Sequence, residues 1–286
     1  MRAVLAVLCA SAGLSVHDAR LIKMTNNAVF YLPSEGLVVR MAMTSALFHR
    51  VEKVVAVARW LAATDVPAIE LDQRFEQPLR AAGTLATVWR FVPPSEPPPD
   101  VRSLAHVIRR WHALQAPALR MPAWNPVGDA RRRLADADGL DDADRDYLLA
   151  RYDALEADLA ELDPALPAGV IHGDAHTGNL IRTANGVVIA DFDNTCIGPR
   201  EWDLVPVAYG ASRFGAPDWQ RAFAEVYGHD VARSLSWPVL RTVRELQMVT
   251  SVVPILASNP RVAAQFRHRM ASIRNGDDHA RWQRYS

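Results

Sequence analysis

Three polar side chains near the middle of the chain have the types and the spacing that phosphoryl transfer needs. Asn179 follows Asp174 by five residues, and Asp191 ends the apolar stretch 187–190. A carboxylate beside an alcohol can orient the hydroxyl group and accept its proton. Carboxylate and carboxamide oxygens suit Mg²⁺, which offsets the charge on nucleotide phosphates. The pattern therefore predicts magnesium-dependent transfer of a phosphoryl group to a hydroxyl.

The same segment also has a simpler interpretation. Asn185-Gly186 is a typical turn of a β hairpin, and the neighbouring carboxylates would then only cap local backbone. We favour the chemical interpretation because the whole set occurs together: His-x-Asp, Asn five residues later, a hairpin, an apolar strand and Asp-Phe-Asp. A carboxylate that ends a buried strand is costly unless a cation or hydrogen-bond donors meet it. A metal ion would remove that cost at Asp191.

The elements that must position these residues begin with a strand-rich region. Alternating and β-branched residues predict strands bounded by turn residues. The predicted strands are 21–24, 28–32, 37–41, 69–71 and 85–92. Apolar residues that recur every three or four positions predict a helix over 45–62. The first 92 residues are therefore expected to form a small, mostly antiparallel sheet with one main helix.

A proline-rich connector separates this region from a largely helical one. Five prolines lie within 93–100 and exclude a helix or a central strand there. Asp100 is a suitable N-cap for a helix over 101–114. The sequence thus predicts an α+β fold with one lobe at 1–92 and a mostly helical lobe at 93–286.

Composition excludes several classes of protein. The 286 residues are 50% hydrophobic and 22% charged, and the formal net charge is zero. Proteins that bind nucleic acid or membrane surfaces broadly carry a basic excess, so neither partner is expected. The two cysteines form neither a metal cluster nor a disulfide framework, which favours a reducing, cytoplasmic location.

Two segments allow alternative interpretations. Residues 3–12 resemble a short signal peptide, but an amphipathic or buried first helix that ends near Gly13 is favoured because the basic region is a single arginine. The stretch 136–163 has eleven acidic and two basic residues along a helical apolar stripe. It is either a solvated helix face, which we favour, or a surface that attracts a cationic substrate.

On these motifs the chain resembles the aminoglycoside phosphotransferase and choline-kinase-like superfamily. There the loop reads His-Gly-Asp with an Asn five residues after the Asp, and a later Asp stands where protein kinases have Asp-Phe-Gly. Segments 109–114 and 197–204 are also similar, and the order of the lobes agrees. The resemblance implies a two-lobed, protein-kinase-like fold and a bacterial small-molecule kinase that uses ATP or GTP with Mg²⁺.

The resemblance also implies a role for each matching residue of the loop. Asp174 would be the catalytic Asp, and His172 would hold the catalytic loop in shape. Asn179 and Asp191 would bind the metal ion, and Asp203 would anchor the loop.

In the small lobe, Arg40 stands where the family usually has a phosphate-contacting Lys, and Glu52 would pair with it. Their simpler interpretations are a surface arginine and a solvated helix face. Asp193 would be a second metal ligand, an acceptor contact or only the cap of a turn. The remaining nucleotide-binding residues implied are Thr25, Asn26 and Asn27 over the phosphates and the hinge Arg90, Phe91 and Val92 along the base.

The predicted function is transfer of the γ-phosphate of ATP or GTP to a small-molecule hydroxyl. Acceptors of the implied kind are an aminoglycoside or other antibiotic, a sugar, or an amino alcohol, and the acidic stretch weakly favours a cationic one. The alternative is an inactive, pseudokinase-like nucleotide-binding regulator, suggested by Arg40 and by the lack of a Gly-rich loop. The three intact polar residues, Asp174, Asn179 and Asp191, favour the enzyme.

Overall fold

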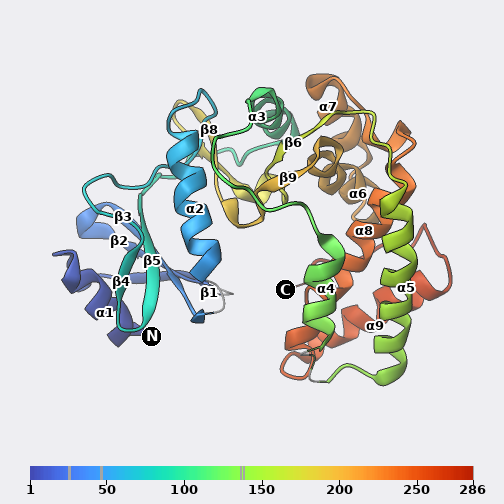
Figure 1. Ribbon diagram of the computed structural model, residues 1–286, viewed down its shortest axis with the longest axis horizontal. Helices are drawn as coiled ribbons and strands as arrows, with labels where there is room; N and C mark the ends of the chain where they lie inside the picture. Colours follow the sequence, from blue (N-terminus) through green and yellow to red (C-terminus); the bar gives the residue numbers. More distant parts are fainter. Residues whose placement is uncertain (25–26, 46–47, 136, 138, 286) are drawn as a thin grey trace. The chain divides into compact units, whose positions relative to one another are not determined.

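The computed structural model describes residues 1–24, 27–45, 48–135, 137 and 139–285. It separates into two compact units, one formed by Met1–Met121 with Thr177–Thr195 and the other by Pro122–His176 with Cys196–Ser286 (Figure 1). The units do not divide at residue 92, as the lobes were predicted to, because helix α3 (Val101–Ala113) packs against strand β8 (Gly186–Ile189) in the first unit.

In the described residues, the first unit contains a sheet of five antiparallel strands in the order β1-β2-β3-β5-β4. The mixed α+β character and the small antiparallel sheet confirm the predicted fold class. Besides α3 and β8, its elements are α1 (Arg2–Ser11), β1 (Arg20–Met24), β2 (Asn27–Leu32), η1 (Pro33–Glu35), β3 (Leu37–Ala42), α2 (Phe48–Leu61), β4 (Leu79–Ala81), β5 (Thr84–Arg90), η3 (Thr177–Asn179), β7 (Leu180–Thr183) and η4 (Phe192–Asn194).

The two faces of this sheet have different partners. Phe30 of β2 lies opposite Val39 of β3, and both join a buried apolar cluster that includes Leu8 of α1. Side chains alternate between faces along a strand, so Val38 and Arg40 point to the opposite face. Figure 1 shows α1 and α2 on opposite sides of the sheet. The predicted amphipathic or buried first helix is therefore present as α1, with Leu5, Leu8 and Cys9 on its buried face.

Most of the predicted strands are confirmed, but the one at 69–71 is wrong. This segment makes isolated bridges, from Ala68 to Ile189 of β8 and from Leu71 to Trp89 of β5. The segment lies between β8 and β5 and forms a single bridge with each, so no continuous ladder of strand pairing forms. Strand β4 was not predicted from the sequence.

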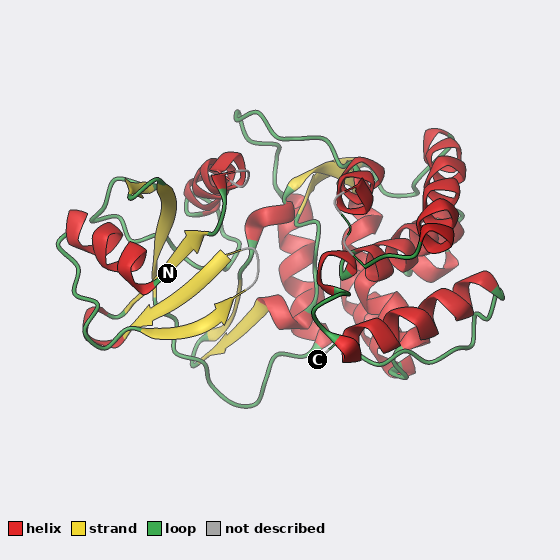
Figure 2. Cartoon of the chain, turned by 90° about the horizontal axis from the view of Figure 1, so that it is seen from below, coloured by secondary structure: helices red, strands yellow, loops and turns green. Residues whose placement is uncertain are grey.

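The second unit is predominantly helical, as predicted, and Figure 2 shows how much of it is helix. Its strand pair β6–β9 is antiparallel, with Ile171 opposite Cys196. The elements are α4 (Pro126–Ala135), α5 (Asp142–Ala160), β6 (Ala168–Ile171), β9 (Cys196–Pro199), η5 (Arg200–Leu204), α6 (Val205–Arg213), α7 (Pro217–Tyr227), η6 (Val231–Arg233), α8 (Trp237–Thr250), η7 (Val253–Ile255) and α9 (Pro260–Arg274).

The acidic stretch forms α5, which buries one face of the helix. Leu148, Tyr152 and Leu155 are buried. On the exposed face, Asp153 lies 2.6 Å from an Arg131 guanidinium nitrogen. At this position the acidic face is partly neutralised within the unit, which favours the structural interpretation. Among the described residues, no helix is long and apolar enough to cross a membrane.

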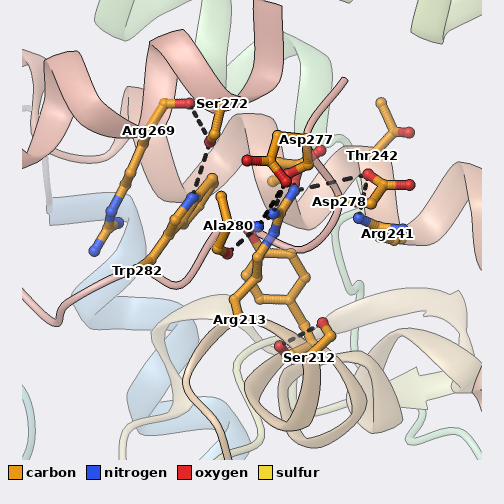
Figure 3. A network of polar contacts seen from close by, with 12 residues as sticks. Ser212, Arg213, Arg241, Thr242, Arg269, Ser272, Asp277, Asp278, Ala280 and Trp282 are labelled. Atoms are coloured by element: carbon orange, nitrogen blue, oxygen red, sulfur yellow. Dashed lines mark hydrogen bonds and ion pairs between the residues drawn. The ribbon is translucent and has the colours of Figure 1, made fainter. Parts of the chain in front are cut away.

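The segment after α9 is held by buried arginines (Figure 3). The indole of Trp282 lies between the guanidinium groups of Arg213 and Arg269, each 4.9 Å from the ring. Its Nε1 donates a hydrogen bond to the Ser272 hydroxyl at 3.0 Å. Arg213, whose side chain is 1% exposed, also pairs with Glu245 of α8. The C-terminal segment is thus part of the core of the second unit.

Candidate active site

The loop that carries Asp174 begins where β6 ends and is anchored by Asp203. The Oδ2 atom of Asp203 accepts the backbone N–H of His172 at 2.7 Å, and its Oδ1 atom accepts that of Gly173 at 2.8 Å. Gly173 has φ of 85°, a conformation that glycine adopts at little cost. The Trp202 indole donates to the carbonyl of Gly173 at 3.0 Å. These contacts confirm the predicted anchoring role of Asp203.

His172 is buried within this loop. Its Nδ1 atom accepts the backbone N–H of Asp174 at 3.3 Å, so the imidazole bridges the turn on which Asp174 lies. Such a contact is consistent with the predicted role of His172, which is to hold the catalytic loop in shape.

The carboxylate of Asp174 lies beside an arginine and a histidine. Its Oδ1 atom is 3.3 Å from Nη1 of Arg244, and its Oδ2 atom is 3.6 Å from Nε2 of His176. Burial alone would raise the pKa of Asp174, but the interactions with His176 and Arg244 outweigh it and hold the pKa below its ordinary value. Asp174 is therefore ionised throughout the physiological range. Arg244 was not identified from the sequence, because it lies on α8 without a local motif.

Asn179 and Asp191 are brought together by the hairpin β7–β8. Leu180 pairs with Ile189, and the Asn179 carbonyl accepts the N–H of Ala190 at 2.8 Å. Backbone bonds from Ile189 to Pro67 and from Ile69 to Ile189 tie the hairpin to the rest of the first unit. The two predicted metal-binding residues thus lie next to each other across one strand pair.

Asp191 differs from the prediction in its environment. Its side chain is 41% exposed, so the argument from a costly buried carboxylate does not apply. The residue has φ of 69°, a left-handed conformation that is uncommon outside glycine and that marks functional turns. Its exposed carboxylate and the neighbouring Asn179 are oxygen donors of the type that Mg²⁺ takes. No group of three or more His, Cys, Asp or Glu residues suited to a metal ion occurs in the part of the chain that the structure describes.

The predicted pairing of Arg40 with Glu52 is wrong. Glu52 instead lies 3.4 Å from Arg80, and both side chains are exposed. Arg40 makes two hydrogen bonds to the carboxylate of Asp193 and lies 3.7 Å from Asp191. Helix α2 turns a different face towards β3 from the one that the resemblance implied.

The residue of α2 that reaches the Asp191 segment is Lys53, next in sequence to Glu52. Its ammonium group donates to the carbonyls of Asp193 and Thr195, at 2.5 and 3.0 Å. The Asn27 side chain, at the start of β2, donates to Asp193 at 3.5 Å. Thr25 and Asn26, the other residues predicted to cover the phosphates, lie outside the described residues.

A largely apolar cavity of about 250 Å³ lies in the first unit beside these charges. The predicted hinge residues Arg90, Phe91 and Val92 line it, together with Arg40 and Asp191. Its apolar lining consists of Ile22, Val29, Val38, Val54, Ile69, Trp89, Ile181, Ala190 and Phe192. The flat, apolar base of a nucleotide would fit such a lining, and the charged groups beside it would contact the phosphates.

Comparison with known proteins fits this arrangement. The chain belongs to the phosphotransferase enzyme family, whose model matches residues 20–246. It is thus an enzyme of the small-molecule kinase class, and the predicted superfamily is confirmed. No curated protein sequence matches the chain significantly.

Several solved kinases share the fold at low sequence identity. The amicoumacin kinase hAmiN is 14% identical with a TM-score of 0.67, over 94% of this chain and 91% of that one. The aminoglycoside phosphotransferase APH(3'')-Id from Streptomyces rimosus is 18% identical with a TM-score of 0.66, over 86% and 97%. A microcompartment-associated aminopropanol kinase is 17% identical with a TM-score of 0.67, over 92% and 94%.

Proposed function

We propose that this enzyme transfers the γ-phosphoryl group of ATP or GTP to a hydroxyl group of a small molecule. The observation that carries the proposal is Asp174, an ionised carboxylate on a loop that Asp203 anchors through two backbone N–H groups. In the reaction, the acceptor oxygen bonds to the γ-phosphorus and the bond to the β–γ bridging oxygen breaks. Asp174 orients the hydroxyl group and takes its proton, which later passes to water.

The first unit would hold the nucleotide. The base would occupy the apolar cavity, and Arg40 would contact the phosphates with its guanidinium fork. Asn179 and Asp191 would bind Mg²⁺, which when present offsets the charge of the phosphates. Their adjacency across the hairpin and the exposure of Asp191 support this assignment.

Part of the hinge backbone is already engaged within the first unit. The N–H of Arg90 donates to the Glu70 carbonyl at 3.0 Å, and the N–H of Phe91 donates to the Gly36 carbonyl at 2.9 Å. Base recognition would therefore rely on the carbonyl groups of the hinge and on the N–H of Val92. Both adenine and guanine offer donors and acceptors for such groups, so ATP and GTP are to be compared directly.

The acceptor is proposed by chemical class only. The compounds after which the solved relatives are named, amicoumacin, an aminoglycoside and aminopropanol, are the first to test. Because Arg244 lies next to Asp174, a cationic acceptor would have to place its charged groups away from the reacting hydroxyl.

The test is a magnesium-dependent nucleotide-consumption assay with ATP and GTP and a panel of aminoglycosides, other hydroxylated antibiotics, sugars and amino alcohols. Wild type is compared with Asp174→Asn, which keeps the volume of the side chain, and with Asp153→Asn as a control for loss of an exposed acid. Loss of the proton acceptor should lower acceptor-stimulated turnover by roughly 100- to 10,000-fold. Nucleotide affinity should stay nearly unchanged.

Near-normal turnover in Asp174→Asn would remove Asp174 from the mechanism. Nucleotide binding without turnover on any acceptor would instead favour the pseudokinase-like alternative.

A further inference from the structure

Arg40 and Asp193 form a two-pronged ion pair inside the first unit. Nη1 of Arg40 donates to Oδ1 of Asp193 at 2.9 Å, and Nη2 donates to Oδ2. Their side chains are 18% and 20% exposed. Parallel N–H···O bonds between a guanidinium and a carboxylate fix the orientation of both groups, and limited exposure reduces screening by water. The pair therefore sets the direction in which the Arg40 guanidinium points.

This pairing argues against Asp193 as a metal ligand. Both of its carboxylate oxygens accept bonds from Arg40, and Oδ2 also receives the weaker contact from Asn27 at 3.5 Å. A divalent cation bound to Asp193 would face the positive guanidinium at close range. Asp191 is more exposed, at 41%, and its nearest Arg40 nitrogen is 3.7 Å away. The two carboxylates of Asp-Phe-Asp thus differ in what they are able to bind.

Lys53 holds Asp193 in place from the other side. Its ammonium group donates to the carbonyls of Asp193 and Thr195, which flank the end of η4. With the backbone of this turn fixed to α2, the Asp193 side chain has a defined position from which to hold Arg40. Helix α2 thus contacts the turn through Lys53, while Glu52 pairs with Arg80 at the surface.

We propose that Asp193 is the residue that positions Arg40 for the nucleotide phosphates and that it does not ligate the metal ion. The inference rests on the proposed nucleotide-dependent function and gives Asp193 a role other than those that the sequence left open. Without the Asp193 charge, the Arg40 guanidinium loses its fixed orientation, so phosphate binding weakens through Arg40.

A double-mutant cycle on nucleotide binding tests the proposal. The equilibrium dissociation constants of ATP and GTP are measured for wild type, Arg40→Met, Asp193→Asn and the double variant, with Mg²⁺ and in excess chelator. Arg131→Met and Asp153→Asn, which break an exposed Arg–Asp pair elsewhere, are the matched controls. Thermal unfolding of each variant verifies that the protein is folded at the assay temperature.

Each single variant should weaken binding about ten-fold, because loss of a charge-assisted contact is worth on the order of one decade in affinity. The double variant should be no weaker than Arg40→Met alone. The loss in Asp193→Asn should persist in chelator, and the Mg²⁺ concentration at half-saturation should stay unchanged.

Asp193 would be a metal ligand after all if its substitution weakened binding equally in both Arg40 backgrounds and only in the presence of Mg²⁺. Failure of wild type to bind either nucleotide would instead overturn the proposed function itself, and this inference with it.

Discussion

The carboxylate of Asp174 is the residue whose chemistry depends most on its neighbours. Arg244 on α8 and His176 two positions later keep it charged despite partial burial. A carboxylate with a lowered pKa is a weak base, so its main contribution would be to orient the hydroxyl group. This fits phosphoryl transfer, in which positioning and charge compensation account for most of the catalysis.

Removal of the Arg244 charge should change the pH dependence of the enzyme. In Arg244→Met the pKa of Asp174 should rise towards its ordinary value, because the cation that favours the ionised form is gone. Asp174 is then protonated at higher pH, so the acid limb of the kcat/KM profile should move to higher pH. The measurement is that profile from pH 3 to 8 for wild type and variant. Arg241→Met, which removes a cation of the same helix that pairs with Asp278, should leave the limb in place.

The same lowered pKa links Asp174 to stability. A group whose pKa is lower in the folded state stabilises the fold at pH values above its unfolded pKa. That contribution is lost as the pH falls through the folded pKa. Protonation of Asp174 should therefore lower the free energy of unfolding only at strongly acid pH.

At the level of elements, the strand pair β6–β9 and the turn after it present the catalytic loop to Asp203. The anchoring carboxylate is fully buried and accepts the backbone N–H groups of His172 and Gly173. These N–H groups lie beyond the β ladder, so loss of the carboxylate would remove the acceptor that takes the place of the ladder. The stability of the loop and the placement of Asp174 thus depend strongly on Asp203.

Substitution of Asp203 by Asn should destabilise the protein and lower kcat together. The amide keeps one acceptor oxygen but turns an NH₂ group towards the other backbone N–H, at a cost of about 1.5–3 kcal/mol. Urea unfolding and steady-state kinetics provide the two readouts. Asp218→Asn, whose side chain is 80% exposed, is the control. Unchanged stability with unchanged kcat would contradict the anchoring role.

Helix α1 should contribute to the folding of the first unit through its buried face. Leu8 is 0% exposed within the apolar cluster of the sheet, whereas the adjacent Val7 is 51% exposed. Leu8→Ala should lower the free energy of unfolding by about 2–5 kcal/mol, because it removes buried methyl groups and leaves a cavity. Val7→Ala should cost far less. Equal effects of the two substitutions in chemical unfolding would show that α1 is not part of the core.

At the level of the whole molecule, stability is distributed over two compact units that each contain segments far apart in sequence. The first unit includes the hairpin 180–189, and the second is completed by the C-terminal segment. In that segment the Trp282 indole is 3% exposed and lies between two guanidinium groups (Figure 3). Cation–π contacts of this kind are strongest where water is excluded.

Trp282→Ala should therefore be strongly destabilising. Loss of the indole removes a large buried surface and its cation–π contacts with Arg213 and Arg269, at a cost of about 3–5 kcal/mol. Trp219→Ala, at a tryptophan that is 40% exposed, is the matched control. The readout is the midpoint of denaturant unfolding. A midpoint no lower than that of the control would mean that the C-terminal segment is not part of the core.

The sequence by itself determined the features that depend on neighbouring residues. Alternation of side chains defined β2 and β3, Asp100 began α3, and Asn185-Gly186 closed the hairpin that joins Asn179 to Asp191. These are local preferences of backbone and side chain, so a short window of sequence contains them.

Only the tertiary structure decided which charged groups meet. Arg40 and Asp193 are 153 residues apart, Lys53 and Thr195 are 142 apart, and Arg244 lies 70 residues from Asp174. Such pairs depend on how helices and strands pack, because a rotation of α2 by one residue exchanges Glu52 for Lys53. Local sequence fixes neither that rotation nor the partners that it brings together.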